Sequence, residues 1–215
     1  VIGVVPYYHG LMINEEDSIY REEQGTKNKE QGIDIAVIHL PRISNSTDFE
    51  PLQQEAGVRL RYIAAPWELN SPDFIIIPGS KSTIDDLAHL REIGLAQAVV
   101  DKAKAGIPVI GICGGFQMLG TKIEDPQHIE SAETSIEGLG LLDVVTTFEG
   151  EKTTHQVTAE VTSDQGLFQG LAGTELTGYE IHMGQTRSGG VSPAFRITRR
   201  SRDRESHPDG AVGNE

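Results

Sequence analysis

Residues 109–120 read VIGICGGFQMLG, an apolar run that leads into a glycine-flanked cysteine and then into a segment able to form a helix. Gly111 and Gly115 bracket Cys113 with the spacing of a nucleophile elbow, the sharp strand-to-helix turn that exposes one reactive side chain. The glycines are needed because Cβ atoms do not fit beside so tight a turn. We therefore expect a strand to end at the cysteine and a helix to begin just after it.

The position of Cys113 predicts a reactive thiol. A helix N-terminus stabilises the thiolate and lowers the pKa of the thiol from its ordinary value of about 8.5. The backbone N–H of Gly114 would then point to the place where an oxyanion forms. The alternative for a lone cysteine is an inert residue in the core. The two flanking glycines favour the reactive interpretation.

Four short apolar runs predict the strands of a parallel sheet that is covered on both faces. They are residues 34–40 (DIAVIHL), 60–64 (LRYIA), 73–77 (DFIII) and 108–112 (PVIGI). One helix is expected between the last two runs, capped by Ser82 and ended by Gly106. Asp85 and Asp86 would lie in its positive first turn. This order predicts an α/β three-layer sandwich with a central, mostly parallel sheet.

The second half of the chain is expected to be rich in β structure. Residues 140–147, 154–162 and 176–182 have the pattern of strands joined by turns, and residues 199–215 form a polar tail. At the other end, residues 1–5 (VIGVV) predict a short strand, and residues 9–29 an acidic linker.

The composition excludes several classes of protein. The 215 residues include 32 acidic and 18 basic side chains, a formal net charge of −14 that disfavours binding to nucleic acid or to anionic membranes. No run approaches the roughly 18 apolar residues that span a bilayer. The single cysteine excludes an internal disulfide and a multi-cysteine zinc site, and it is compatible with the cytoplasm. The start of the chain has neither Met nor a signal peptide, and we expect it to be internal to a longer protein.

The elbow sequence G-I-C-G-G-F-Q-x-L-G resembles the nucleophile motif of class I (triad-type) glutamine amidotransferase domains, which have a flavodoxin-like fold. Four more segments resemble the cobyric acid synthase branch of that family: 5–19 (VPYYHGLMINEEDSI), 40–49 (LPRISNSTDF), 77–86 (IPGSKSTIDD) and 178–184 (GYEIHMG). The branch that amidates the cobyrinic acid a and c side chains is a weaker fit.

The resemblance implies roles for individual residues. Cys113 would attack the glutamine amide and become a glutamyl thioester, with the backbone N–H groups of Gly79 and Gly114 as oxyanion donors. Gln117 would lie near the bound glutamine; the alternative is a surface or helix-capping side chain. Residues 77–83 (IPGSKST) lack the full spacing of a phosphate-binding loop.

The general base is harder to place. His182 lies in a segment that lines the glutamine pocket in related domains, and we expect it to be pocket-lining rather than the base. Glu180 is a candidate orienting acid. In this branch the catalytic histidine belongs to a later Tyr-x-His-Gly motif, so it is expected beyond Glu215. The predicted organisation is a tail and linker of a preceding synthase domain at residues 1–32, followed by an amidotransferase domain at 33–215 that is truncated at its C-terminus.

The implied function is the release of ammonia from glutamine for an ATP-dependent ligase. That ligase would amidate carboxylates of adenosylcobyrinic acid diamide in cobalamin biosynthesis. Its synthase domain, on the same chain, would hold the corrinoid, ATP and Mg²⁺, and no cofactor or metal is expected in this domain. Three alternatives stay open: an amidotransferase of the a,c-diamide synthase or another type, a non-catalytic docking domain, and a flavodoxin-like domain with peptidase or stress functions.

Overall fold

The computed structural model describes residues 32–213, without the side chains at 151–153 and 205. The strand predicted at residues 1–5, the acidic linker and the resembling segment at 5–19 lie outside the described residues. Within the described part of the chain, no helix is long and apolar enough to cross a membrane.

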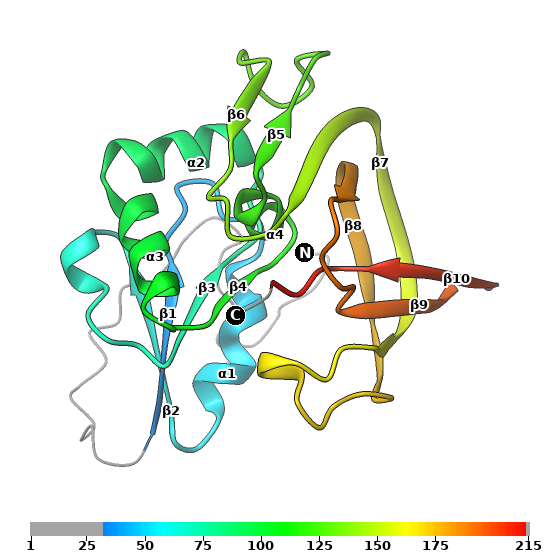
Figure 1. The fold of residues 1–215 in the computed structure, drawn as a ribbon, viewed down its shortest axis with the longest axis horizontal. Coiled ribbons are helices and arrows are strands. Elements are labelled where there is room, and N and C mark those ends of the chain that lie inside the picture. Colours follow the sequence, from blue (N-terminus) through cyan, green and yellow to red (C-terminus); the bar gives the residue numbers. More distant parts are fainter. Residues whose placement is uncertain (1–31, 214–215) are drawn as a thin grey trace, which may run out of the picture.

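A four-stranded parallel sheet forms the first half of the fold (Figure 1). Its strands are β1 (Ile33–Ile38), β2 (Val58–Ile63), β3 (Phe74–Ile77) and β4 (Val109–Gly111), in the order β2-β1-β3-β4. All four predicted strands are confirmed. Consecutive residues of β1 are buried from Ile35 to Ile38, because both faces of the sheet are covered.

The helix predicted between β3 and β4 is two helices. They are α2 (Thr83–Glu92) and α3 (Leu95–Lys104), and the single-helix prediction was wrong. Gly94 separates them with a φ of 78°, a left-handed conformation that ends α2 and that glycine adopts at little cost. Asp85 and Asp86 lie in the first turn of α2, as predicted. Ser82 occupies the cap position, but its hydroxyl bonds Asp85 instead of capping the helix.

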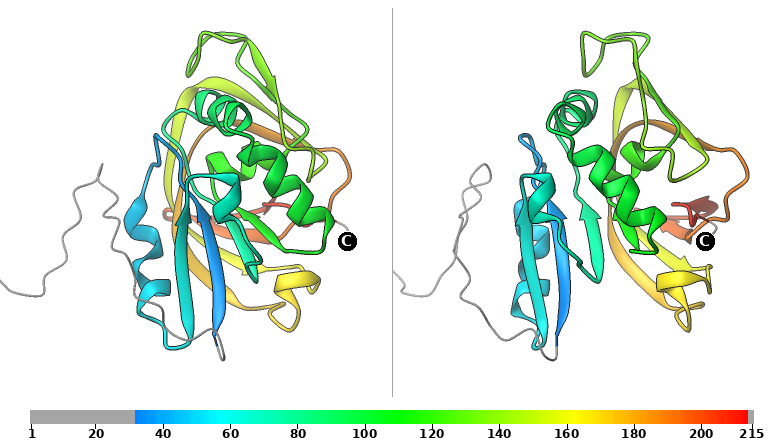
Figure 2. Two further views of the ribbon diagram at one scale, coloured as in Figure 1. Left: turned by 90° about the vertical axis from the view of Figure 1, so that its left-hand side faces the viewer. Right: turned by 60° about the vertical axis from the view of Figure 1, so that its left-hand side comes forward.

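Two short α-helices also belong to the first half. They are α1 (Glu50–Gln54), which precedes β2, and α4 (Gly114–Leu119), which follows β4. Helix α4 contacts β3 and β4 of the parallel sheet and also β5 and β7 of a second sheet. The right-hand view in Figure 2 shows the blue and cyan strands of the parallel sheet apart from the long yellow and orange strands of the second sheet.

The second sheet is mixed and has the order β10-β9-β7-β5-β6, with β8 paired to β7. Its strands are β5 (Lys122–Glu124), β6 (Ser135–Glu137), β7 (Val144–Val161), β8 (Glu175–Ser188), β9 (Phe195–Arg200) and β10 (Asp203–Asp209). The two strands predicted at 140–147 and 154–162 are one strand, β7, with a register shift between Thr147 and Lys152 in its pairing to β8. The predicted turn between them was wrong because the irregularity bends a continuous strand.

The polar tail predicted from residue 199 was also wrong. Arg199 and Arg200 end β9, and β10 pairs antiparallel with it to form a hairpin. A strand with one solvated face needs few apolar residues. The many charged residues of this segment therefore did not exclude strands, although they suggested a tail.

One hydrophobic core joins the two halves. It includes Ile75 of β3, Leu87 of α2, Met118 of α4 and Phe148 of β7. Full burial of such a side chain contributes about 1.5–3 kcal/mol. The elbow that carries Cys113 therefore lies where the two packed sheets meet.

Candidate active site

Cys113 occupies a strained turn between β4 and α4. Its φ of 50° and ψ of −112° are rare for any residue other than glycine. A Cβ on Gly115 would lie 2.0 Å from the carbonyl oxygen of Ile77, and one on Gly111 would lie 2.6 Å from the backbone of Gly115. Only glycine fits at both positions, which confirms the elbow geometry predicted from the sequence.

The thiol is exposed and faces strand β8. Its Sγ lies 3.4 Å from the carbonyl oxygen of Ile181, to which it donates a hydrogen bond. Gly79, which follows the neighbouring strand β3, is adjacent: a Cβ built on it would lie 3.6 Å from the Cβ of Cys113. Gly79 and Cys113, which the resemblance assigned to one site, thus lie side by side at the carboxyl ends of β3 and β4.

A polar cluster missed by sequence reasoning fixes the loop that contains Gly79. The carbonyl oxygen of Gly79 accepts the N–H of Ser44 at 3.0 Å, which ties this loop to the one after β1. Asp86 is fully buried, and its carboxylate accepts the hydroxyl of Ser80 at 2.6 Å and the guanidinium of Arg42 at 3.0 Å. Arg42 and Ser44 lie in segment 40–49, which was noted in the sequence only for its resemblance to the family and was given no structural role.

Gln117 is buried, and its carboxamide is bonded to two other elements. Its Nε2 donates to the carbonyl oxygen of Met183 on β8 at 3.1 Å, and its Oε1 accepts from Thr83 Oγ1 of α2 at 3.4 Å. The alternative of a surface or helix-capping glutamine was therefore wrong. A role near bound glutamine stays a prediction.

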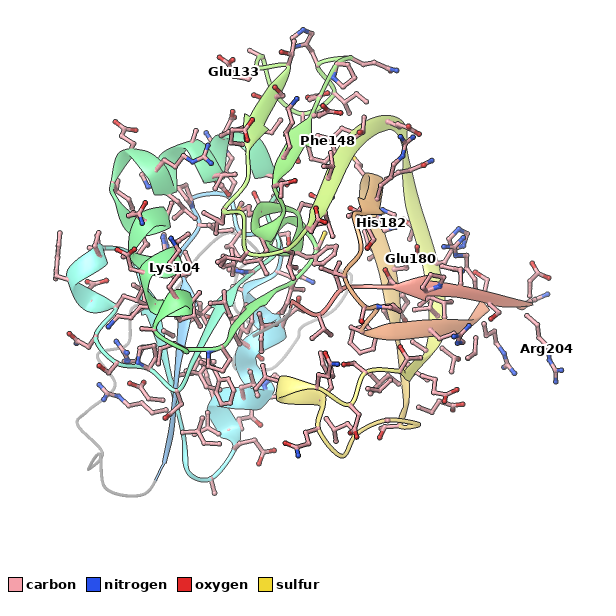
Figure 3. All side chains as sticks on the ribbon, viewed as in Figure 1. Lys104, Glu133, Phe148, Glu180, His182 and Arg204 are labelled. Atoms are coloured by element: carbon pink, nitrogen blue, oxygen red, sulfur yellow. The ribbon has the colours of Figure 1, made fainter. Side chains whose placement is uncertain are left out.

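His182 and Glu180 lie on β8 and point toward each other (Figure 3). The His182 Nε2 is 2.9 Å from Oε1 of Glu180, and its Nδ1 is 3.1 Å from the carbonyl oxygen of Gly184. Both ring nitrogens of His182 therefore face oxygen atoms of β8 itself.

Arg200 completes the group around Glu180. Its Nε and one terminal nitrogen each lie 2.8 Å from a carboxylate oxygen of Glu180, in a two-point ion pair. Burial raises the pKa of the Glu180 carboxyl, but the hydrogen bonds from His182 and Arg200 and the charge of Arg200 outweigh it. The pKa is held below its ordinary value, so Glu180 is ionised at neutral pH.

Within residues 32–213, no group of three or more His, Cys, Asp or Glu side chains could hold a metal ion. Around Cys113 the structure brings together an exposed thiol, the start of α4 and the hydrogen-bonded residues Glu180 and His182 of β8.

Comparison with known sequences gives a consistent family. The CobB/CobQ-like glutamine amidotransferase domain matches residues 34–215. Cobyric acid synthase from Dehalococcoides mccartyi is 47% identical over 215 residues, which cover 100% of this chain and 42% of that protein. Cobyric acid synthase from Pelotomaculum thermopropionicum is 51% identical over 213 residues, which cover 99% of this chain and 40% of that protein. The chain thus spans about two fifths of these relatives.

Two solved structures share the fold. PurLQS from Thermotoga maritima aligns with a TM-score of 0.62 at 20% identity, over 80% of this chain and 77% of that one. A second structure, described as a glutamine amidotransferase, aligns with a TM-score of 0.55 at 18% identity, over 75% of this chain and 79% of that one. These likenesses show the α/β fold with its parallel sheet. The sequence match over residues 34–215 shows the family: the chain belongs to the CobB/CobQ-like glutamine amidotransferase domain family.

Proposed function

We propose that Cys113 is the nucleophile that releases ammonia from glutamine. The observation that carries the proposal is the strained elbow, which exposes the only cysteine of the chain beside Gly79. The thiolate adds to the side-chain amide carbon of glutamine, and the amide oxygen becomes an oxyanion. The C–N bond then breaks, ammonia leaves after taking up a proton, and a thioester remains. Water hydrolyses the thioester to glutamate and returns the thiol.

The backbone N–H groups of Gly79 and Gly114 are the proposed oxyanion donors. Gly114 is the first residue of α4, so its N–H has no acceptor within the helix. Gly79 lies on the loop that Ser44 and Asp86 fix in place, which supports a preset geometry. Removing one donor of this kind typically costs about 10²–10³-fold in kcat.

We assign His182 to the wall of the glutamine pocket. Both of its ring nitrogens face acceptors, so it is poorly arranged to accept the proton of Cys113. The resemblance to related domains implies that a histidine of a later motif, and not His182, is the general base. Glu180 would keep His182 in position rather than take part in proton transfer.

The complete reaction extends beyond this chain. Because the chain spans about two fifths of relatives named cobyric acid synthase, we propose that the same protein carries an ATP-dependent synthase portion. That portion would bind ATP, Mg²⁺ and adenosylcobyrinic acid diamide, and it would use the ammonia to amidate the corrinoid carboxylates.

A diazoketone analogue of glutamine tests the first step. We expect intact mass analysis to show one adduct, at Cys113, whose formation glutamine slows and which Cys113→Ala abolishes. A docking domain or an unrelated thiol enzyme would show no protection by glutamine. Adduct formation that glutamine does not slow would contradict the proposal.

A further inference from the structure

The loop between β5 and β6 is organised by a buried carboxylate. Asp125 is fully buried and accepts the backbone N–H groups of Ile129, Glu130 and Ser131 at 2.8, 2.9 and 3.0 Å. Burial raises the pKa of Asp125, but these three hydrogen bonds outweigh it and hold the pKa below its ordinary value. The loop is therefore held in one conformation, and this conformation directs Glu130 toward α2.

Glu130 caps the N-terminus of α2 in place of Ser82. Its Oε2 accepts the N–H of Thr83 at 2.9 Å and the N–H of Ile84 at 3.4 Å, and its Oε1 lies 3.3 Å from Thr83 Oγ1. A carboxylate at this end of a ten-residue helix also complements the helix dipole. Burial is the main influence on the pKa of Glu130 and raises it. The carboxyl group is therefore partly desolvated where the β5–β6 loop meets α2.

The contacts continue from Thr83 to the elbow. Thr83 Oγ1 donates to the carboxamide of Gln117, which in turn donates to the carbonyl oxygen of Met183. The same hydroxyl would lie 2.9 Å from a Cβ on Gly114, so it packs directly against the residue after the nucleophile. On β8, Met183 lies two residues from Ile181, whose carbonyl oxygen accepts from Cys113. Alternate carbonyl groups of a strand lie on the same edge. Strand β8 is thus held against the elbow at two successive points of that edge.

We propose that Glu130 is a positioning residue for glutamine cleavage, acting through Thr83 and Gln117 on the Gly114 peptide and on β8. This inference rests on the proposed function, because it assigns Glu130 to the same site without contact to the substrate. The hydroxyl of Thr83 can bond only one acceptor at a time. When the carboxylate of Glu130 holds the start of α2, that hydroxyl stays within reach of Gln117. Without the carboxylate, the first turn of α2 loses its cap, and the oxyanion donor and β8 lose a common support.

The test compares two alkylating reagents on Cys113 in the full-length protein. The diazoketone glutamine analogue needs an intact pocket, whereas iodoacetamide needs only an accessible thiol. For Glu130→Ala we expect labelling by the analogue to slow by about 10–100-fold, as misplacement by about 1 Å can cost 10²-fold. Labelling by iodoacetamide should change by less than about threefold, because the thiol itself stays exposed. Peptide mass mapping of the segment that contains Cys113 gives both rates.

Three variants separate positioning from a general loss of stability. Glu130→Gln should restore most of the analogue rate, because its carboxamide oxygen accepts the two N–H groups and its nitrogen donates to Thr83. Thr83→Val keeps the side-chain shape but removes the hydroxyl link, and it should reproduce the Glu130→Ala effect even if Glu130→Ala does not fold. Glu133→Ala, on the same loop with an exposed side chain (Figure 3), is the matched control and should label like the wild type.

The outcomes are distinguishable. If the wild type is not labelled by the analogue, or glutamine does not slow its labelling, the proposed function fails and this inference fails with it. If the wild type is labelled and protected, but Glu130→Ala and Thr83→Val keep its analogue rate, only the positioning role is overturned. Equal slowing by both reagents, or no recovery in Glu130→Gln, would overturn it as well.

Discussion

The two halves of the molecule contribute to the site in different ways. In the parallel half, β1 is buried at four consecutive residues, Ile35 to Ile38, and Cys113 is placed by its own neighbours Gly111 and Gly115. In the second half, β8 is largely exposed, with Tyr179 at 74% and Ile181 at 45% relative exposure. It reaches Cys113 through backbone carbonyl groups. The first half sets the position of Cys113 by local geometry, and the second completes its surroundings by long-range polar contacts.

The largest expected effect comes from removing the nucleophile that we propose for the parallel half, Cys113. We expect Cys113→Ala to lower ammonia release from glutamine by at least about 10⁴-fold, because other groups of a site rarely take over the role of a residue in a catalytic unit. A coupled assay of ammonia release by the full-length protein measures it. A loss smaller than tenfold would mean that the elbow thiol is not the attacking group.

The next-largest effect tests whether a glycine in the crowded elbow matters more for stability than a glycine with open space around it. A Cβ on Gly115 would meet the Ile77 carbonyl oxygen at 2.0 Å, whereas one on Gly150, in β7, would meet nothing within 4 Å. Gly115→Ala should lower the free energy of unfolding by about 3 kcal/mol. Gly150→Ala should stay within about 0.5 kcal/mol of the wild type. Urea titrations of both variants give the comparison, and similar losses in the two would contradict it.

A smaller effect is expected from β8. His182→Ala should raise KM for glutamine by about tenfold, or about 1.4 kcal/mol, with kcat changed little, because we propose that His182 lines the glutamine pocket and does not accept a proton. Steady-state ammonia release separates the two constants. If kcat collapses while KM stays at the wild-type value, His182 is the general base and our placement of it is wrong.

The smallest effect concerns the ion pair behind His182. The pKa of Glu180 lies below its ordinary value of 4.5 in the folded protein. Its carboxylate therefore stabilises the fold above the ordinary pKa, and this contribution is lost as the pH falls through the lowered pKa. The stability difference between wild type and Glu180→Gln should shrink as the pH is lowered from 6 to about 3. A difference that is constant over this range would show that the charge of Glu180 does not matter to β8.

Sequence reasoning worked best where the structural signal was local. The elbow needs glycine on both sides of Cys113, and that requirement is visible in five consecutive residues, 111–115. The apolar runs of the parallel strands are equally direct, because burial on both faces leaves little room for polar residues. The break at Gly94 was missed because a single glycine is tolerated within many helical patterns.

The second half and the polar contacts around the site could not be predicted in the same way. Strands β9 and β10 carry mostly charged residues, since one solvated face leaves only every second position to the core. The carboxylate of Glu130 caps a helix 46 and 47 residues earlier in the chain, and Gln117 bonds a carbonyl 66 residues away. No spacing in the sequence indicates such pairs.

The sequence by itself thus determined the α/β core, the exposed thiol and the family to which it is similar, because each depends on short-range sterics or on contiguous burial. Only the tertiary structure decided which groups surround the thiol. The bonds from Cys113 to Ile181 and from Gln117 to Met183 depend on how the two sheets pack. Packing brings distant polar groups within hydrogen-bond distance only after the chain has folded, so their partners are a property of the fold as a whole.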